Sequence, residues 1–242
     1  MREPGGEPIE TGTVTARPER PVLVFDTATT IAVVGLGTTG GRLVAEAAWP
    51  AGYRHGEELL PRIDGLLAEV AVGLHELGGI VVGIGPGAFT GLRVGLATAK
   101  GLAHGLGIPL VGVPTGLALA NAAILVDPTT PPVAGLLPAG PSDRILIDPQ
   151  GRASLLAAGS EPPLEPGWRL FAIDLDGRAP ADALDLGTQI RAHLALSLLQ
   201  LGAGRLGESS PSDLATLVPE YVTLPRGVRQ ESGAMAWSRD PS

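Results

Sequence analysis

Residues 79–113 read GIVVGIGPGAFTGLRVGLATAKGLAHGLGIPLVGV, and this stretch decides the fold class. It opens with an apolar run at 80–84, rich in the β-branched residues that buried strands prefer. The next segment, 85–91, contains too much glycine and proline for regular structure. A helical pattern follows over 92–104, and 108–113 is a second strand-like run. Strand, glycine-rich loop, helix and strand form a βαβ unit, which predicts an α/β fold with parallel strands.

The glycine-rich loop allows two interpretations. Backbone N–H groups at a helix start can cradle a phosphate, which makes Gly85, Gly87 and Thr90 candidate phosphate-loop residues. Alternatively, the glycines only permit a tight turn and close packing. The loop is not a Walker A motif, because no Lys-Ser or Lys-Thr pair follows its last glycine.

Asp26 closes an apolar strand predicted over 22–25 and also has two interpretations. In actin- and hexokinase-like folds an aspartate at the end of the first strand faces a phosphate or its metal ion. The alternative is an Asx turn, in which the carboxylate accepts nearby backbone N–H groups. Further strands are expected at 31–36 and 43–49, which would form an antiparallel meander leading into the parallel unit.

Two helical segments carry unusual surfaces. In the helix after the loop, a ridge of small residues recurs every fourth position, at Gly91, Gly95, Ala99 and Ala103. Such a ridge lets another element approach closely, although the pattern leaves open whether that element lies in this chain or another. The helix predicted from His55 onward has two adjacent apolar stripes: Leu59, Ile63, Leu66 and Val70, and Leu60, Leu67 and Leu74. This face is wider than covering one side of a sheet requires, so part of it is available for a second surface.

The composition excludes several classes of function. The 242-residue chain has 25 acidic and 17 basic residues, a net charge of −8 and no cysteine. Lys100 is its one lysine and the arginines are scattered, so direct nucleic-acid binding by this chain alone is not expected. No apolar run is long enough for a membrane span, and the N-terminus has no apolar signal-like segment. The absence of cysteine fits a cytoplasmic protein.

A family resemblance enters at residues 85–103, GPGAFTGLRVGLATAKGLA, which resemble the signature of the TsaB (YeaZ) family. The segments RHGEELLP at 54–61 and VPEYV at 218–222 are similar to further motifs of that family. The resemblance is strong over residues 21–126 and thin afterwards. The family is related more loosely to its catalytic paralogue TsaD.

The resemblance implies a two-lobed α/β fold of the actin/hexokinase (ASKHA) type, with a mixed sheet and flanking helices in each lobe. It also implies a non-catalytic subunit that supports TsaD, which transfers the threonylcarbamoyl group to adenosine 37 of tRNA. A TsaE-like ATPase would join through the complex, and self-association is possible on the same surface. The family's interface uses the two helices described above, so the interface residues expected here are Leu60, Ile63, Leu67, Gly95 and Ala99.

Missing motifs argue against catalysis by this chain. The metal-binding H-x-x-x-H pair of TsaD corresponds to Thr115 and Leu119, and leucine cannot coordinate a metal. No catalytic residue, cofactor or metal ion is therefore expected. The family's D-A-R-x-x-E-V-Y motif is replaced by residues 138–145, PAGPSDRI, which indicates a degenerate second lobe. The alternative function is an ATP-dependent phosphotransferase that uses Asp26 and the glycine-rich loop, and a peptidase ranks below it.

The expected domain organisation has four parts. Residues 1–20 and 226–242 are expected to be disordered tails, because they lack apolar periodicity. Residues 21–126 form the first lobe and 127–225 the second, with the boundary at the Pro- and Thr-rich turn after Val126.

Overall fold

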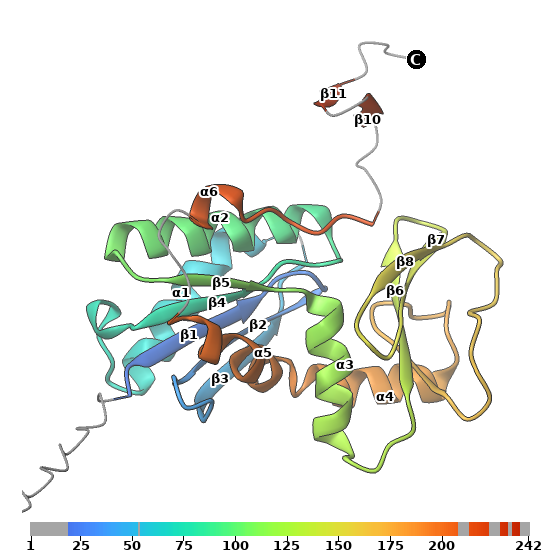
Figure 1. Ribbon diagram of the computed structural model, residues 1–242, viewed down its shortest axis with the longest axis horizontal. Helices are drawn as coiled ribbons and strands as arrows, with labels where there is room; N and C mark the ends of the chain where they lie inside the picture. The colour runs from blue at the N-terminus through green and yellow to red at the C-terminus, as the bar shows by residue number, and fades with distance from the viewer. Residues whose placement is uncertain (1–18, 53, 208–212, 223–227, 232–233, 238–242) are drawn as a thin grey trace, which may run out of the picture.

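The computed structural model describes residues 19–52, 54–207, 213–222, 228–231 and 234–237 (Figure 1). Its first sheet has the strand order β3-β2-β1-β4-β5. The strands β1, β2 and β3 form an antiparallel meander, and β4 and β5 continue from β1 in parallel. The predicted meander and βαβ unit are therefore confirmed. The bounds are Pro21–Asp26 for β1, Ile31–Thr38 for β2, Leu43–Pro50 for β3, Gly79–Gly83 for β4 and Leu110–Val113 for β5.

Helices cover both faces of this sheet (Figure 1). On one face lie α1 (His55–Glu69) and α2 (Phe89–Leu106), and on the other α3 (Thr115–Val126) and α5 (Leu194–Gly202). Alternate side chains of β1 serve the two layers, as the two-residue period of a strand requires. Leu23 and Phe25 pack with the α1 and α2 layer. Val22 and Val24 belong to the cluster that contains α5.

The second sheet repeats the beginning of the first. Its order is β8-β7-β6-β9, with β6, β7 and β8 antiparallel and β9 parallel to β6. No helix separates β8 from β9 at residues 157–168, where α1 stands in the first repeat, and α4 packs on β9. This two-lobed mixed α/β arrangement confirms the predicted fold class. The bounds are Val133–Ala139 for β6, Asp143–Ile147 for β7, Ala153–Leu156 for β8, Arg169–Ala172 for β9 and Ala181–Arg191 for α4.

The two lobes share one core. The helix α5 follows the second sheet in sequence but packs on strands of the first sheet. One cluster of buried residues runs from β1 through α3 and α5 to β6 and β9. The expected boundary after Val126 falls in the turn between α3 and β6, and the chain returns across it.

The ends of several elements differ from the sequence predictions. The α1 helix stops at Glu69 because Ala71 adopts a left-handed φ of 54° and the Val72 N–H closes on the Leu67 carbonyl, so Leu74 lies outside the helix. The helix predicted over 187–201 is two helices, α4 and α5, because the first packs on the second sheet and the other on the first.

The C-terminal part also differs in detail. The predicted element at 217–221 has no helix or strand and instead follows the short α6 (Asp213–Thr216). A disordered tail was expected from residue 226, but β10 (Val228–Glu231) pairs with β11 (Ala234–Trp237) in an antiparallel hairpin. The predicted N-terminal tail lies outside the described residues, except for residues 19 and 20.

The edge strand β3 carries a carboxyl group, that of Glu46, whose titration we expect to have a small effect on stability. Desolvation by burial raises the pKa of Glu46 above its ordinary value, and the nearby charge of His193 lowers it by a smaller amount. Because the folded-state pKa is the higher one, folding favours the protonated form, and this contribution is lost as the pH rises through the folded pKa. Glu46→Gln should therefore raise the melting temperature slightly at pH 7 and leave it unchanged near pH 4, measured by thermal unfolding. Glu165→Gln, on an exposed loop, is the control; equal pH dependence in both variants would contradict the assignment.

Candidate partner interface and interlobe cleft

The structure separates the five predicted interface residues into two groups. Leu60 is 50% exposed on α1. Ile63 and Leu67 are 2% and 4% exposed, and Gly95 and Ala99 are buried on the inner side of α2. Four of the five therefore face the interior of their own chain and only Leu60 is exposed, while the assignment of these residues to a partner interface stays a prediction.

The small-residue ridge of α2 packs against the chain's own sheet. A Cβ atom on Gly95 would lie 2.2 Å from the Oγ1 atom of Thr27, the residue that follows β1. The Thr27 hydroxyl donates to the Gly91 carbonyl at 2.8 Å, which ties the same ridge to the strand end. The question left open by the pattern is thus answered: the ridge permits close approach within the monomer.

A second stripe of small residues lies on the outer side of the same helix. Ala97, Gly101 and Gly105 are exposed, and a Cβ on either glycine would meet no atom within 4 Å. These positions also recur every fourth residue, so the sequence carried two equivalent stripes and no local signal to choose between them. On α1 the exposed residues include Leu60, Pro61, Gly65 and Ala68. The outer face, defined as these seven residues, is the surface of the α1 and α2 layer that the described chain leaves uncovered.

Asp26 forms an Asx turn. It is 1% exposed, and its Oδ1 atom accepts the Ala28 N–H at 2.6 Å. Its Oδ2 atom accepts the Thr115 hydroxyl at 2.6 Å. A Cβ on Gly83 would fall 1.7 Å from the same oxygen, so the carboxylate is enclosed by its own chain. This geometry is that of the structural interpretation.

The glycine-rich loop is held by the same group of residues. Gly85, with a φ of 103°, donates its N–H to the Thr115 hydroxyl at 3.0 Å. The Ala88 N–H donates to the Ala28 carbonyl at 2.7 Å, and a Cβ on Gly87 would lie 2.2 Å from that oxygen. These contacts support the interpretation that the glycines permit a tight turn and close packing. Thr90, the third candidate phosphate-loop residue, is exposed at the start of α2. Nothing in the sequence marked Thr115 as the residue that joins the loop to Asp26.

The cleft between the lobes has a volume of about 370 Å³, and Asp174 is among the residues that line it. Thr30, at its edge, donates its N–H and hydroxyl to Asp174 at 2.7 and 2.5 Å. Arg191 donates to the same carboxylate at 3.2 Å. Asp174 adopts a left-handed φ of 58°, which non-glycine residues rarely do.

Metal ligands are not gathered anywhere in the described part of the chain, where no group of three or more His, Cys, Asp or Glu residues could hold an ion. Thr115 and Leu119, the two positions that the resemblance aligns with metal ligands of TsaD, are both buried: the Thr115 hydroxyl donates to Asp26, and Leu119 lies in the core. No helix of the described residues has the length and apolar character that crossing a membrane requires.

The chain is similar in sequence to two groups of proteins. A family model described as "TsaD: tRNA N6-adenosine threonylcarbamoyltransferase" matches residues 50–158. The tRNA threonylcarbamoyladenosine biosynthesis protein TsaB of Escherichia coli is 33% identical over 102 residues, 42% of this chain and 43% of that protein. A tRNA N6-adenosine threonylcarbamoyltransferase of Cereibacter sphaeroides is 33% identical over 193 residues, 80% of this chain and 46% of that protein. The chain thus spans less than half the length of these curated relatives.

The fold is similar to that of a solved structure over nearly its whole length. YeaZ from Pseudomonas aeruginosa superposes with a TM-score of 0.60 at 25% sequence identity. The match covers 84% of this chain and 99% of the YeaZ chain.

Proposed function

Because the chain belongs to the TsaB (YeaZ) family, we propose that it is a non-catalytic subunit that binds a TsaD-like transferase. On this proposal it supports threonylcarbamoyl transfer to tRNA adenosine, and a TsaE-like ATPase joins through the complex. The observation that carries the proposal is the outer face of α1 and α2. It is apolar or nearly free of side chains, and the described chain does not cover it.

The physical argument is one of close approach. Small residues let two helices pack at short axial distance, and an exposed leucine beside them supplies apolar area to bury. Leu60 is such a residue, and Gly65 and Gly101 add no side chain that would hold a partner away. A phosphotransferase would need Asp26 and the glycine-rich loop to contact a phosphate or its metal ion. Instead, the Asp26 carboxylate is buried and accepts hydrogen bonds from Ala28 and Thr115, which supports a structural role.

The test is association with the host's own TsaD-like subunit. Leu60→Asp should weaken binding at least about tenfold, because a charge would be placed at the centre of an apolar contact. Ile124→Asp is the matched control, since Ile124 is 54% exposed on α3, away from the outer face. Calorimetry with both variants measures the effect, and equal binding by Leu60→Asp and wild type would contradict the proposal.

A further inference from the structure

A small polar cavity lies at the junction of the two lobes, beside the interlobe cleft. Its volume is about 180 Å³, and both it and the cleft are lined by Thr30 and Asp174. The first lobe contributes Thr30 and the first residue of β2 to its lining. The second lobe contributes the end of β9, the segment that follows it, and one side of α4. We call this feature the junction cavity.

Arg191 of α4 lines the junction cavity and keeps hydrogen-bond donors available there. Its side chain is 16% exposed, and it donates to the Oδ1 atom of Asp174 at 3.2 Å. A guanidinium has five N–H donors, and the described chain provides no other acceptor for this one. The side-chain atoms that are buried without a partner in the described residues belong to Thr38 and Trp49, so the remaining Arg191 donors are open to water. They can therefore bind a carboxylate that enters the cavity.

Asp174 fixes the Arg191 side chain and is itself satisfied. Its side chain is 7% exposed, and it accepts the N–H and the hydroxyl of Thr30 at 2.7 and 2.5 Å. Together with the bond from Arg191, this carboxylate accepts three hydrogen bonds from the two lobes. The charges of Asp174 and Arg191 balance each other, so a ligand does not have to neutralise Asp174.

Asp176 adds a negative charge that has no such balance. It is exposed, lines the same cavity and forms no ion pair within the described residues. Thr188 lies beside it in the lining, and its hydroxyl donates to the Leu184 carbonyl at 3.1 Å. Because that proton is already used, the Thr188 oxygen can act as an acceptor. A carboxylate and a hydroxyl oxygen are suitable partners for an ammonium group.

We propose that the junction cavity binds a small zwitterion of the α-amino acid class, with its carboxylate on Arg191 and its ammonium group on Asp176 and Thr188. A simple anion would be repelled by Asp176, and a simple cation would leave the Arg191 donors without an acceptor. A ligand that carries both charges complements both groups. The volume of 180 Å³ is below the range of about 300–1,000 Å³ for drug-sized ligands, so the ligand must be small.

This inference goes beyond the proposed function and uses a different surface. The lining of the junction cavity includes no residue of the outer face of α1 and α2. Binding acts on the junction of the lobes instead, since Thr30 comes from the first lobe and Arg191 from the second. A ligand that binds only the folded chain should therefore raise the melting temperature as its concentration rises.

Calorimetric titration of the full chain with glycine, alanine and serine tests the proposal. At least one of them should bind with a dissociation constant of about 1 mM or below. Acetate and methylammonium each carry one of the two charges, so each should bind at least about tenfold more weakly. Trimethylglycine keeps both charges but has no N–H donor, and it should also bind weakly.

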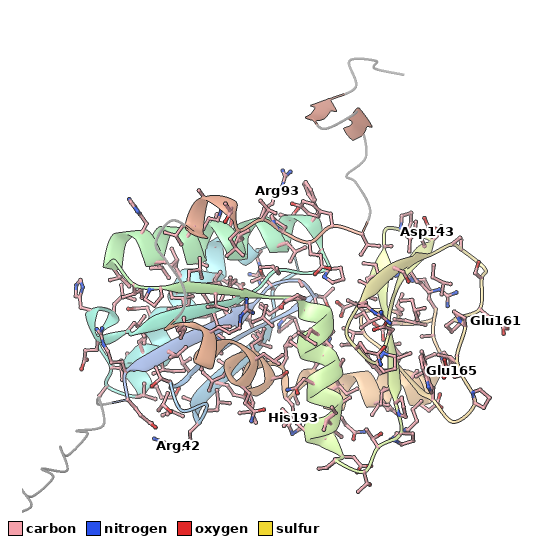
Figure 2. All side chains as sticks on the ribbon, in the orientation of Figure 1. Arg42, Arg93, Asp143, Glu161, Glu165 and His193 are labelled. Atoms are coloured by element: carbon pink, nitrogen blue, oxygen red, sulfur yellow. The ribbon has the colours of Figure 1, made fainter. Side chains whose placement is uncertain are left out.

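Asp176→Asn is the decisive variant, because this exposed side chain has no ion pair whose loss would disturb the fold. It should weaken amino-acid binding at least about tenfold. Glu161→Gln is the matched control and should bind as wild type does, since Glu161 is exposed on the outer side of the second lobe, away from the first (Figure 2). Arg191→Lys keeps the positive charge but loses the planar fork of donors, and it should also bind more weakly. Thermal unfolding without ligand shows whether each variant keeps its fold.

Three results would overturn the proposal. They are no saturable binding of any amino acid up to about 50 mM, binding of acetate or methylammonium as tight as that of glycine, and unchanged binding by Asp176→Asn. None of these results bears on the proposed function, which is tested by Leu60→Asp on the outer face. Conversely, amino-acid binding that depends on Asp176 would stand even if no TsaD-like subunit bound.

Discussion

Gly101→Ala is expected to stabilise the chain, whereas the same substitution at Gly95, six residues earlier in the same helix, should destabilise it. Both glycines lie inside α2, where replacing glycine by alanine gains up to about 1 kcal/mol of helix propensity. At Gly101 the added methyl group meets nothing within 4 Å, so this gain is retained. At Gly95 the methyl group would lie 2.2 Å from the Thr27 hydroxyl oxygen, which is closer than any non-bonded contact allows.

The Thr27 side chain, which a methyl group on Gly95 would contact, has little room to move. Thr27 is fully buried and its hydroxyl is bonded to the Gly91 carbonyl, so relief of the clash breaks that bond or moves α2 off the sheet. Overpacking of this kind costs about 1–3 kcal/mol, and the lost hydrogen bond adds to it. Urea denaturation of the two variants beside wild type measures the difference. Stabilisation by both substitutions would show that the ridge does not pack against β1.

Thr115→Val should destabilise the chain by about 3 kcal/mol, because it removes the donor to a buried carboxylate and the acceptor of a buried N–H. The Thr115 hydroxyl donates to Asp26 at 2.6 Å and accepts from Gly85 at 3.0 Å. Valine has nearly the same shape, so packing is preserved while both bonds are lost. All three residues are buried, and water cannot replace the missing partner without entering the core.

Thr115→Ser is the matched control for this network. Serine keeps the hydroxyl and loses one methyl group, which costs about 1 kcal/mol. Equilibrium unfolding at pH 7 compares the three chains. If valine and serine reduce stability equally, the hydroxyl contributes little and Asp26 is held by other contacts. A larger loss for valine would support a structural role for the Thr115 hydroxyl.

Local pattern accounts for most of the elements that the sequence predicts correctly. The strands at 22–25 and 80–84, the glycine-rich loop and the helix after it are encoded by neighbouring residues, because burial on a sheet or a helix face sets a period of two or 3.6. The family assignment rests on the same continuous stretch. Element ends were less accurate. The end of α1 depends on one residue, Ala71, in a left-handed conformation that no glycine signals.

The site depends on contacts between distant residues, and here the sequence left real ambiguity. Two stripes of small residues run along α2, and only the packing of Gly95 on Thr27 shows which one faces inward. The sequence left open whether Asp26 binds a phosphate or forms an Asx turn, because its hydrogen-bond donor, the Thr115 hydroxyl, lies 89 residues away. The interface residues expected from helical spacing and the family resemblance therefore include four that are buried within the monomer.

The amino-acid sequence by itself determined the βαβ unit, the mixed sheet around it and the family, because each is written in residues close together along the chain. Only the tertiary structure decided which side of α2 is free, what Asp26 binds and how α5 returns to the first sheet. Those features depend on which surfaces meet after the chain has folded. The α2 helix carries small residues on two sides with equal local cost, and the packing of one side against β1 leaves the other side exposed.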